Sequence, residues 1–127
     1  MKPLIFLAAC LAAAGCAQSS VTTATPSPAL VQRVAAAGPN VCSEEAAAAL
    51  AGAGVTAEQV EGVYYQPVLG GVDQDTVVGY MAWTRLRDRP GHLVVNMAAD
   101  TMNAECTATG VYTRGGLEVA GVPGYGS

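Results

Sequence analysis

The sequence has few cationic and few bulky aromatic residues. Lysine occurs once, at Lys2, histidine once, at His92, and phenylalanine and tryptophan once each. The formal net charge is −4, so the chain lacks the basic surface that nucleic-acid binding needs. It also has no basic amphipathic stretch for an anionic lipid surface. Because bulky apolar side chains are scarce, part of the stability must come from a source other than a large core.

The motifs that catalysis requires are absent as well. There is no glycine-rich phosphate loop and no Cys-x-x-Cys pair, and a single histidine leaves a metal site short of ligands. His92 follows a Pro-Gly turn and is interpreted as an exposed turn residue. Asp73 and Asp75 lack the further oxygen ligands of a calcium loop. We therefore predict a non-enzymatic protein with no catalytic residues, no metal and no cofactor.

A short apolar run directly behind Met1 and Lys2 is the first feature that the sequence does contain. It covers residues 3–17, which is 15 residues, whereas crossing a bilayer takes about 20. The charged start, the apolar middle and the small residues at the end are the three parts of a secretory signal. The small residues lead directly into Cys16.

Ala13, Ala14, Gly15 and Cys16 resemble the lipobox of bacterial lipoproteins. The resemblance covers residues 1–16 and differs from the commonest pattern in having alanine at position 13 in place of leucine. In that family the cysteine thiol receives diacylglycerol, a signal peptidase cleaves before it, and the freed amine is acylated by a fatty acid such as palmitate. The resemblance implies that Cys16 is the lipidated first residue of the mature chain.

The same resemblance implies an address in the cell envelope. The mature protein is expected on a membrane, facing the periplasm or the cell exterior. Ala17 stands where an aspartate would favour the inner membrane, so the outer membrane is expected instead. An ordinary secretory signal with incidental cysteines is the alternative. Cys10 also ends a fitting four-residue motif, but cleavage there would leave a very short apolar segment, so Cys10 is assigned to the discarded signal.

Cys42 and Cys106 remain once Cys10 and Cys16 are assigned. Two cysteines in an oxidising envelope predict a disulfide. They lie 64 residues apart, so on the chain-entropy account the bond contributes roughly 4 kcal/mol. A metal or redox role is the alternative, but neither the spacing nor the available ligands support it.

The chain divides into four predicted segments. Residues 1–15 are the signal peptide, and residues 16–38 are the lipidated cysteine and a flexible Ser/Thr/Pro/Ala tether. Residues 39–121 form a small domain, and residues 122–127 a disordered tail. Within the tether, residues 29–37 also have the apolar spacing of a short helix that Gly38 and Pro39 would end.

The predicted fold class is α+β. Ser43 is expected to cap a helix with Glu44 and Glu45 in its first turn, and residues 56–59 have capping-box spacing. From residue 62 onward, alternation and turn residues predict strands over 63–68, 75–87, 92–98, 105–114 and 117–120. Together these predict a small antiparallel β-meander of about four strands, with one short N-terminal helix packed on one face and stapled by the disulfide.

One group of residues is predicted to form an interaction patch. Arginine and tryptophan are enriched where proteins bind one another. Such residues gather at one end of a predicted hairpin, and they are Trp83, Arg85, Arg87 and Arg89. In the alternative interpretation, Trp83 belongs to the core and the arginines are solvated and paired with Asp88 and Glu105.

These observations predict an envelope lipoprotein that acts by contact. Its membrane contact is the lipid anchor, and its other partner is an unidentified envelope protein or the cell wall. Neither nucleic acid nor a small-molecule cofactor is expected. The alternative is a lipid-anchored inhibitor of an extracellular hydrolase of the lysozyme or protease type, for which a small disulfide-stapled sheet domain is a suitable scaffold.

Overall fold

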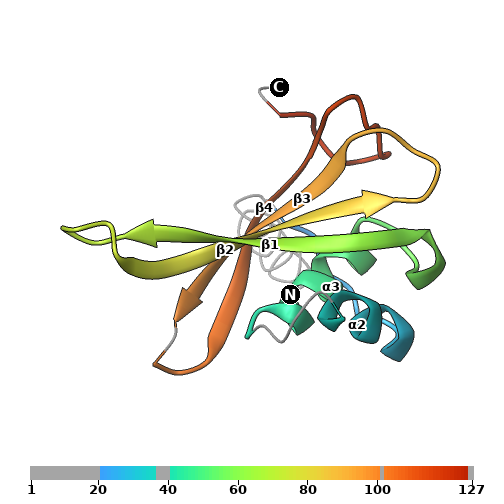
Figure 1. The fold of residues 1–127 in the computed structure, drawn as a ribbon. Helices are drawn as coiled ribbons and strands as arrows, with labels where there is room; N and C mark the ends of the chain where they lie inside the picture. The colour runs from blue at the N-terminus through green and yellow to red at the C-terminus, as the bar shows by residue number, and fades with distance from the viewer. Residues whose placement is uncertain (1–20, 37–40, 101, 126–127) are drawn as a thin grey trace, which may run out of the picture.

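The computed structural model describes residues 21–36, 41–100 and 102–125, so the predicted signal and Cys16 lie outside the described residues. One antiparallel sheet has the strand order β1-β2-β3-β4, in which every strand pairs with its neighbour in sequence (Figure 1). This confirms the predicted α+β class and the meander. The elements are α2 (Pro28–Ala35), α3 (Ser43–Gly52), the 3-10 helix η1 (Ala57–Gln59), β1 (Val60–Gly70), β2 (Thr76–Leu86), β3 (His92–Asp100) and β4 (Glu105–Arg114).

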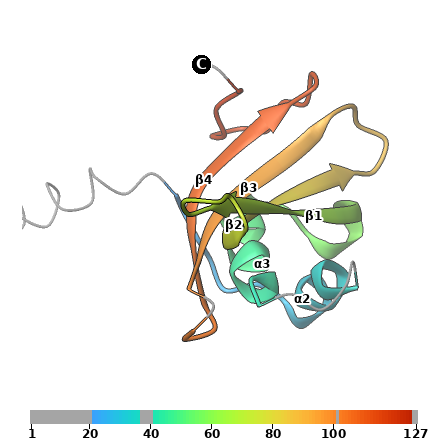
Figure 2. The same ribbon diagram turned by 60° about the vertical axis from the view of Figure 1, so that its left-hand side comes forward.

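Two helices cover one face of the sheet, where the predicted fold had one packed helix (Figure 2). The short helix expected over residues 29–37 forms as α2. Leu30 and Val34 of α2 are one turn apart and both are buried in the core. Ser27 caps this helix by accepting the Leu30 N–H at 3.1 Å, and Pro28 occupies the first helical turn. The packed part of the chain therefore begins before residue 39, inside the segment assigned to the tether.

The segment before α2 also lies against the fold. The Ala24 N–H donates to the Ala48 carbonyl at 3.0 Å, and Val21 packs partly buried against the core. A Cβ on Gly52 would lie 2.0 Å from the Thr22 carbonyl oxygen, so only glycine permits this approach. Of the predicted tether, residues 21–27 are thus laid along α3.

α3 is built mainly of alanine, and small side chains let it lie close to the sheet. Ala46, Ala47, Ala49 and Leu50 are fully buried against strand residues. No helix in the described part of the chain is long and apolar enough to cross a membrane.

The predicted disulfide between Cys42 and Cys106 is present and joins the start of α3 to β4. Their Cα atoms are 5.3 Å apart, and Cys42 is fully buried. Cys42 is also the N-cap residue of α3, so Ser43 is the first helical residue and not the cap that the sequence predicted. The Ser43 hydroxyl instead accepts a hydrogen bond from the Tyr65 hydroxyl at 3.3 Å.

The strands predicted over residues 63–68 and 92–98 are longer in the structure, and the strand predicted over residues 75–87 is one residue shorter at each end. The strand predicted over residues 105–114 is found with the same bounds. The strand predicted over residues 117–120 does not form. Gly115 and Gly116 have positive φ and turn the chain, and Leu117 then enters the core. Farther on, the Thr113 N–H donates to the Pro123 carbonyl and the Tyr125 N–H to the Thr113 carbonyl, each at 2.9 Å. Residues up to 125 therefore pack on the β4 edge, where a tail from residue 122 was expected.

Replacing both Cys42 and Cys106 with alanine is expected to lower the free energy of unfolding by roughly 4 kcal/mol. Without the bond, the unfolded chain regains the conformational entropy that closing the 64-residue loop had removed. Urea denaturation of the chain from Ala17 onward measures this loss. The unreduced parent chain, denatured, should react with less than one equivalent of thiol reagent. Two equivalents would show that the bond is not made.

Thr84→Val is expected to stabilise the protein by about 1 kcal/mol. Thr84 is fully buried on β2, and its hydroxyl has no hydrogen-bond partner among the described residues. Valine has nearly the same shape and removes the unsatisfied oxygen. Thr84→Ser is the matched control, since it keeps the hydroxyl and loses the methyl group, and its melting temperature should fall. A lower melting temperature for the valine variant would contradict the assignment.

Candidate functional site

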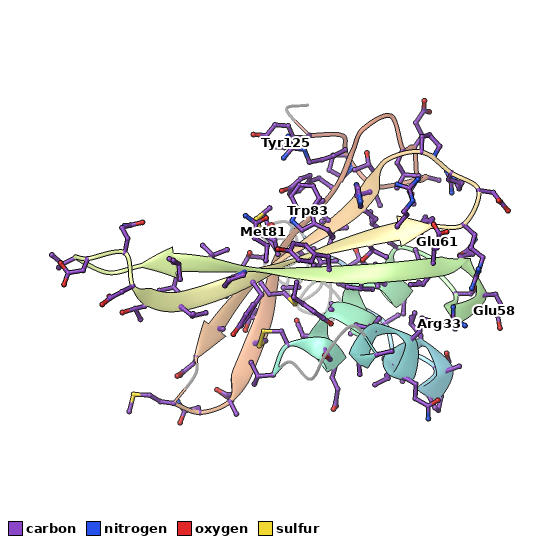
Figure 3. The ribbon with its side chains drawn as sticks, viewed as in Figure 1. Arg33, Glu58, Glu61, Met81, Trp83 and Tyr125 are labelled. Atoms are coloured by element: carbon purple, nitrogen blue, oxygen red, sulfur yellow. A yellow bond between two sulfur atoms is a disulfide. The ribbon has the colours of Figure 1, made fainter. Side chains whose placement is uncertain are left out.

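The sheet has one face packed against the helices and one open face. Along β2, Ala82, Thr84 and Leu86 point to the helices and are buried. Met81 and Trp83 alternate with them and lie on the side opposite α2 and α3, as Figure 3 shows. The interpretation of Trp83 as part of the helix-side core is therefore wrong, and its ring belongs to the open face.

Strand register arranges the open face in four rows that run across the strands. Neighbouring strands lie about 4.8 Å apart, so one row of four residues spans roughly 14 Å. Cross-strand neighbours in a row are close enough for their side chains to interact. The rows are a basic row (Gly62, Arg85, His92, Arg114), an aromatic row (Tyr64, Trp83, Val94, Tyr112), an amide row (Gln66, Met81, Asn96, Gly110) and a small row (Val68, Gly79, Ala98, Thr107).

An aromatic–arginine cluster is centred on the guanidinium of Arg114. Its Cζ lies 5.5 Å from the ring centroid of Trp83 and 4.1 Å from that of Tyr125, so the cation sits between two rings. Tyr112 contacts Tyr125 at 5.5 Å, and the His92 ring meets Trp83 edge-on at 5.6 Å. We define the cluster as Trp83, His92, Tyr112, Arg114 and Tyr125.

Hydrogen bonds and exposure describe the rest of the aromatic row. The Trp83 Nε1–H donates to Gln66 Oε1 at 2.9 Å, which fixes the indole in its plane. Tyr64, next to Trp83 on β1, is 65 % exposed, and Tyr125 on the other side of the cluster is also 65 % exposed. Val94 is fully buried between Trp83 and Tyr112 in the row. The open face therefore has a small apolar centre of its own with solvent-facing rings at both flanks.

The predicted patch residues do not all gather at this cluster. Arg85 lies on the open face, where its Nε is 3.2 Å from Glu61 Oε1. The Arg87 Nε–H donates to the Glu58 carbonyl at 2.8 Å, and Arg89 donates to the carbonyl of Glu118. Within the described residues, no arginine forms an ion pair with Asp88 or Glu105, so that proposed pairing is not seen.

Sequence reasoning missed Arg114 and Tyr125. Arg114 ends β4 and pairs directly with His92 at the start of β3. That partnership could have been found from the two predicted strands, because a short β3–β4 turn fixes which residues face one another. Tyr125 carried no such signal, since it lies beyond the last strand and reaches the cluster only through the turn at Gly115 and Gly116.

Arg114 differs from the other arginines in what its guanidinium contacts. Arg33 Nη1–H donates to the Val60 carbonyl at 2.8 Å, and the three arginines of the predicted patch each donate to a carbonyl or a carboxylate. Arg114 contacts aromatic rings, and among the described residues its N–H groups have no hydrogen-bond acceptor and no ion-pair partner. Glu118 lines the groove beside Arg114 without pairing with it.

Two hollows lie at opposite ends of the open face. A groove of about 390 Å³ runs beside Arg114 and is bounded by Gly115, Glu118 and Tyr125. A depression of about 360 Å³ lies over Gly79 at the other end. Gly79 is required there because a Cβ would lie 2.3 Å from the Met97 carbonyl oxygen.

Asn96 borders the depression with an unused acceptor. Its Oδ1 is buried and has no hydrogen-bond partner within the described chain. Buried polar atoms are normally hydrogen-bonded, so this oxygen, like the buried Thr84 hydroxyl, carries a desolvation cost, and because it is buried it is not open to a ligand. Over residues 21–36, 41–100 and 102–125, no three His, Cys, Asp or Glu side chains gather as metal ligands would. The open face presents ring faces and a guanidinium that has no hydrogen-bond acceptor among the described residues, and both groups can take part in binding.

Comparisons of the chain with protein-family models, with curated proteins and with solved structures give no match. The interpretation of the site therefore depends on its geometry alone.

Arg114→Met is expected to change the fluorescence of Trp83, the single tryptophan, because the cation over its ring is lost. The free energy of unfolding should fall by about 1 kcal/mol or less, as for an exposed cation–π contact. Emission spectra and thermal unfolding measure both effects. Arg87→Met is the control, because it removes the same charge from a residue that donates to the Glu58 carbonyl and does not contact Trp83. It should leave the emission spectrum unchanged. Equal spectra for Arg114→Met and the parent would contradict the stacking.

Proposed function

We propose that this protein is a lipid-anchored bacterial envelope protein that acts by contact through its open sheet face. The anchor is inferred from the resemblance of residues 13–16 to a lipobox, with Cys16 as the lipidated residue. The observation that carries the contact function is the aromatic–arginine cluster on a sheet face that no helix of the described chain covers. The partner is a protein of the envelope or the cell wall.

The composition of the open face supports this proposal. Tryptophan, tyrosine, methionine and arginine are the residue types enriched at interfaces, and all four occur here within three adjacent rows. Residues that dominate binding energy are commonly Trp, Tyr and Arg with partial exclusion of water. Trp83 and Arg114 fit that description, being half-buried and flanked by exposed tyrosines.

The path of the chain from the proposed anchor also supports it. Val21 packs against the core on the helix side of the sheet, and Cys16 is five residues earlier. Five residues span at most about 18 Å, so a lipid on Cys16 would hold the helix layer close to the membrane. The open face on the other side of the sheet is then directed away from the lipid and toward the surrounding envelope.

A second candidate function is a lipid-anchored inhibitor of an extracellular hydrolase. The β1–β2 hairpin supports it, because this hairpin projects beyond the rest of the sheet (Figure 1). Its apolar tip is solvent-exposed, with Val72 100 % exposed and Leu69 about half exposed. An inhibitor would insert this tip into an active-site cleft, so Leu69→Asp should abolish inhibition of a lysozyme or protease and Trp83→Ala should not.

In-cell photo-crosslinking distinguishes contact through the open face from contact elsewhere. A crosslinking amino acid at Tyr64 is expected to capture an envelope component, and one at Glu44, on α3, should not. Trp83→Ala should reduce capture at Tyr64 at least fivefold while the far-UV spectrum is retained. Capture from position 44 alone, or capture that survives Trp83→Ala, would contradict the proposed face.

The anchor is tested separately by intact mass. Material from a bacterium that carries out lipoprotein processing should begin at Cys16 and carry the mass of a diacylglycerol and a further acyl chain. Two or more chains give stable membrane binding, and one chain does not. A bare residue 16, or a chain that still includes residues 1–15, would contradict the lipid anchor.

A further inference from the structure

We propose that the ligand of the open face is a linear strand of cell-wall peptidoglycan, with Arg114 as the residue that binds a carboxylate of its stem peptides. This inference depends on the proposed function, since it names the partner of the same face. It is argued from the unpaired cation, from the exposed rings and from the size of the face.

The charge at Arg114 selects an anionic group. The chain has a formal net charge of −4, yet the Arg114 guanidinium has no carboxylate partner among the described residues. The rings of Trp83 and Tyr125 lie 5.5 Å and 4.1 Å from its Cζ and restrict its movement. A planar fork of N–H donors matches the two oxygens of a carboxylate. His92 lies directly opposite Arg114 in the β3–β4 register and can add a further N–H donor to the same group.

The exposed rings select flat apolar faces. Tyr64 and Tyr125 are each 65 % exposed on either side of Trp83, so ring faces are available across the row. The C–H face of a sugar ring packs on such surfaces, while its hydroxyl and amide groups donate hydrogen bonds.

The dimensions favour a linear ligand over a globular one. Four rows spaced two residues apart extend about 20 Å along the strands and about 14 Å across them. This area of the sheet is smaller than the roughly 800 Å² of surface that each partner buries in a standard protein interface. The groove beside Arg114 and the depression over Gly79 lie at its two ends. A chain lying along the strands would place its carboxylate at Arg114 and its far end over Gly79.

Co-sedimentation with purified, protein-free peptidoglycan sacculi tests this inference. The mature protein in detergent is expected to sediment with sacculi, and amidation of the sacculus carboxylates should lower the bound fraction about tenfold. Arg114→Gln should weaken binding about 10- to 100-fold, the effect of losing charge-assisted hydrogen bonds. Arg87→Gln removes the same charge from a residue bonded to the Glu58 carbonyl and should bind like the parent.

Tyr64→Ala is a second variant that leaves the Arg114 stack untouched, because Tyr64 lies on β1. It should weaken sedimentation about fivefold, and an unchanged far-UV spectrum of each variant reports that the sheet is intact. Full binding to amidated sacculi, or equal binding by Arg114→Gln and the parent, would overturn the inference.

Polyglutamate is the competitor that separates glycan from protein ligands. If polyglutamate releases the protein from sacculi only when its carboxylate concentration far exceeds that of the sacculi, the result supports peptidoglycan as the ligand. If polyglutamate releases the protein when its carboxylate concentration equals that of the sacculi, the ligand is an acidic protein segment and the peptidoglycan inference is overturned. Capture of an envelope protein from Tyr64 without sacculus binding would likewise overturn it and leave the proposed function standing. Failure of both assays would overturn both.

Discussion

The link between α3 and β4 is the constraint on which the rest of the fold depends. The buried faces of α3 are mostly alanine, and alanine buries little apolar area. Two connections between distant segments compensate for this: the disulfide from Cys42 to Cys106, and the hydrogen bond from the Ala108 N–H to Glu45 Oε2 at 2.8 Å. Both lie at the start of α3, so they fix the helix against the last strand before any side-chain packing is counted.

Holding both helices on one side leaves the sheet with two unlike faces. The helix-side face supplies the core, in which Leu93 and Val95 of β3 meet Leu50 of α3. Among the described residues, the C-terminal segment borders the other face at β4, where Thr113 exchanges hydrogen bonds with Pro123 and Tyr125. The same contacts and Glu45 occupy backbone groups of the β4 edge, which would otherwise be free to pair with another strand. The open face is thus available for binding without leaving the whole of that edge unprotected.

The arginines show how the chain distributes its few cations. Arg33, Arg87 and Arg89 donate to backbone carbonyls and so connect loops and helices to the sheet. Arg85 forms an exposed ion pair with Glu61, a kind of contact that contributes little to stability. Arg114 alone among the five is held by rings, with its N–H donors unused within the described chain. Hydrogen bonds or an ion pair within the fold account for the contacts of the other four, and a binding role for the fifth is our proposal.

The sequence by itself determined the meander, the β4 bounds and the disulfide, because side-chain alternation, the Pro90-Gly91 turn and cysteine number are local or countable. The lipid anchor remains a prediction from residues 13–16. Only the tertiary structure decided that α2 belongs to the core and that Tyr125 packs on Arg114. It also decided that Arg87 and Arg89 form hydrogen bonds with backbone carbonyls and do not join the cluster around Trp83. Each of these depends on contacts between residues far apart in the chain. A helix with two buried side chains or a segment after the last strand has no local pattern that says what it will pack against.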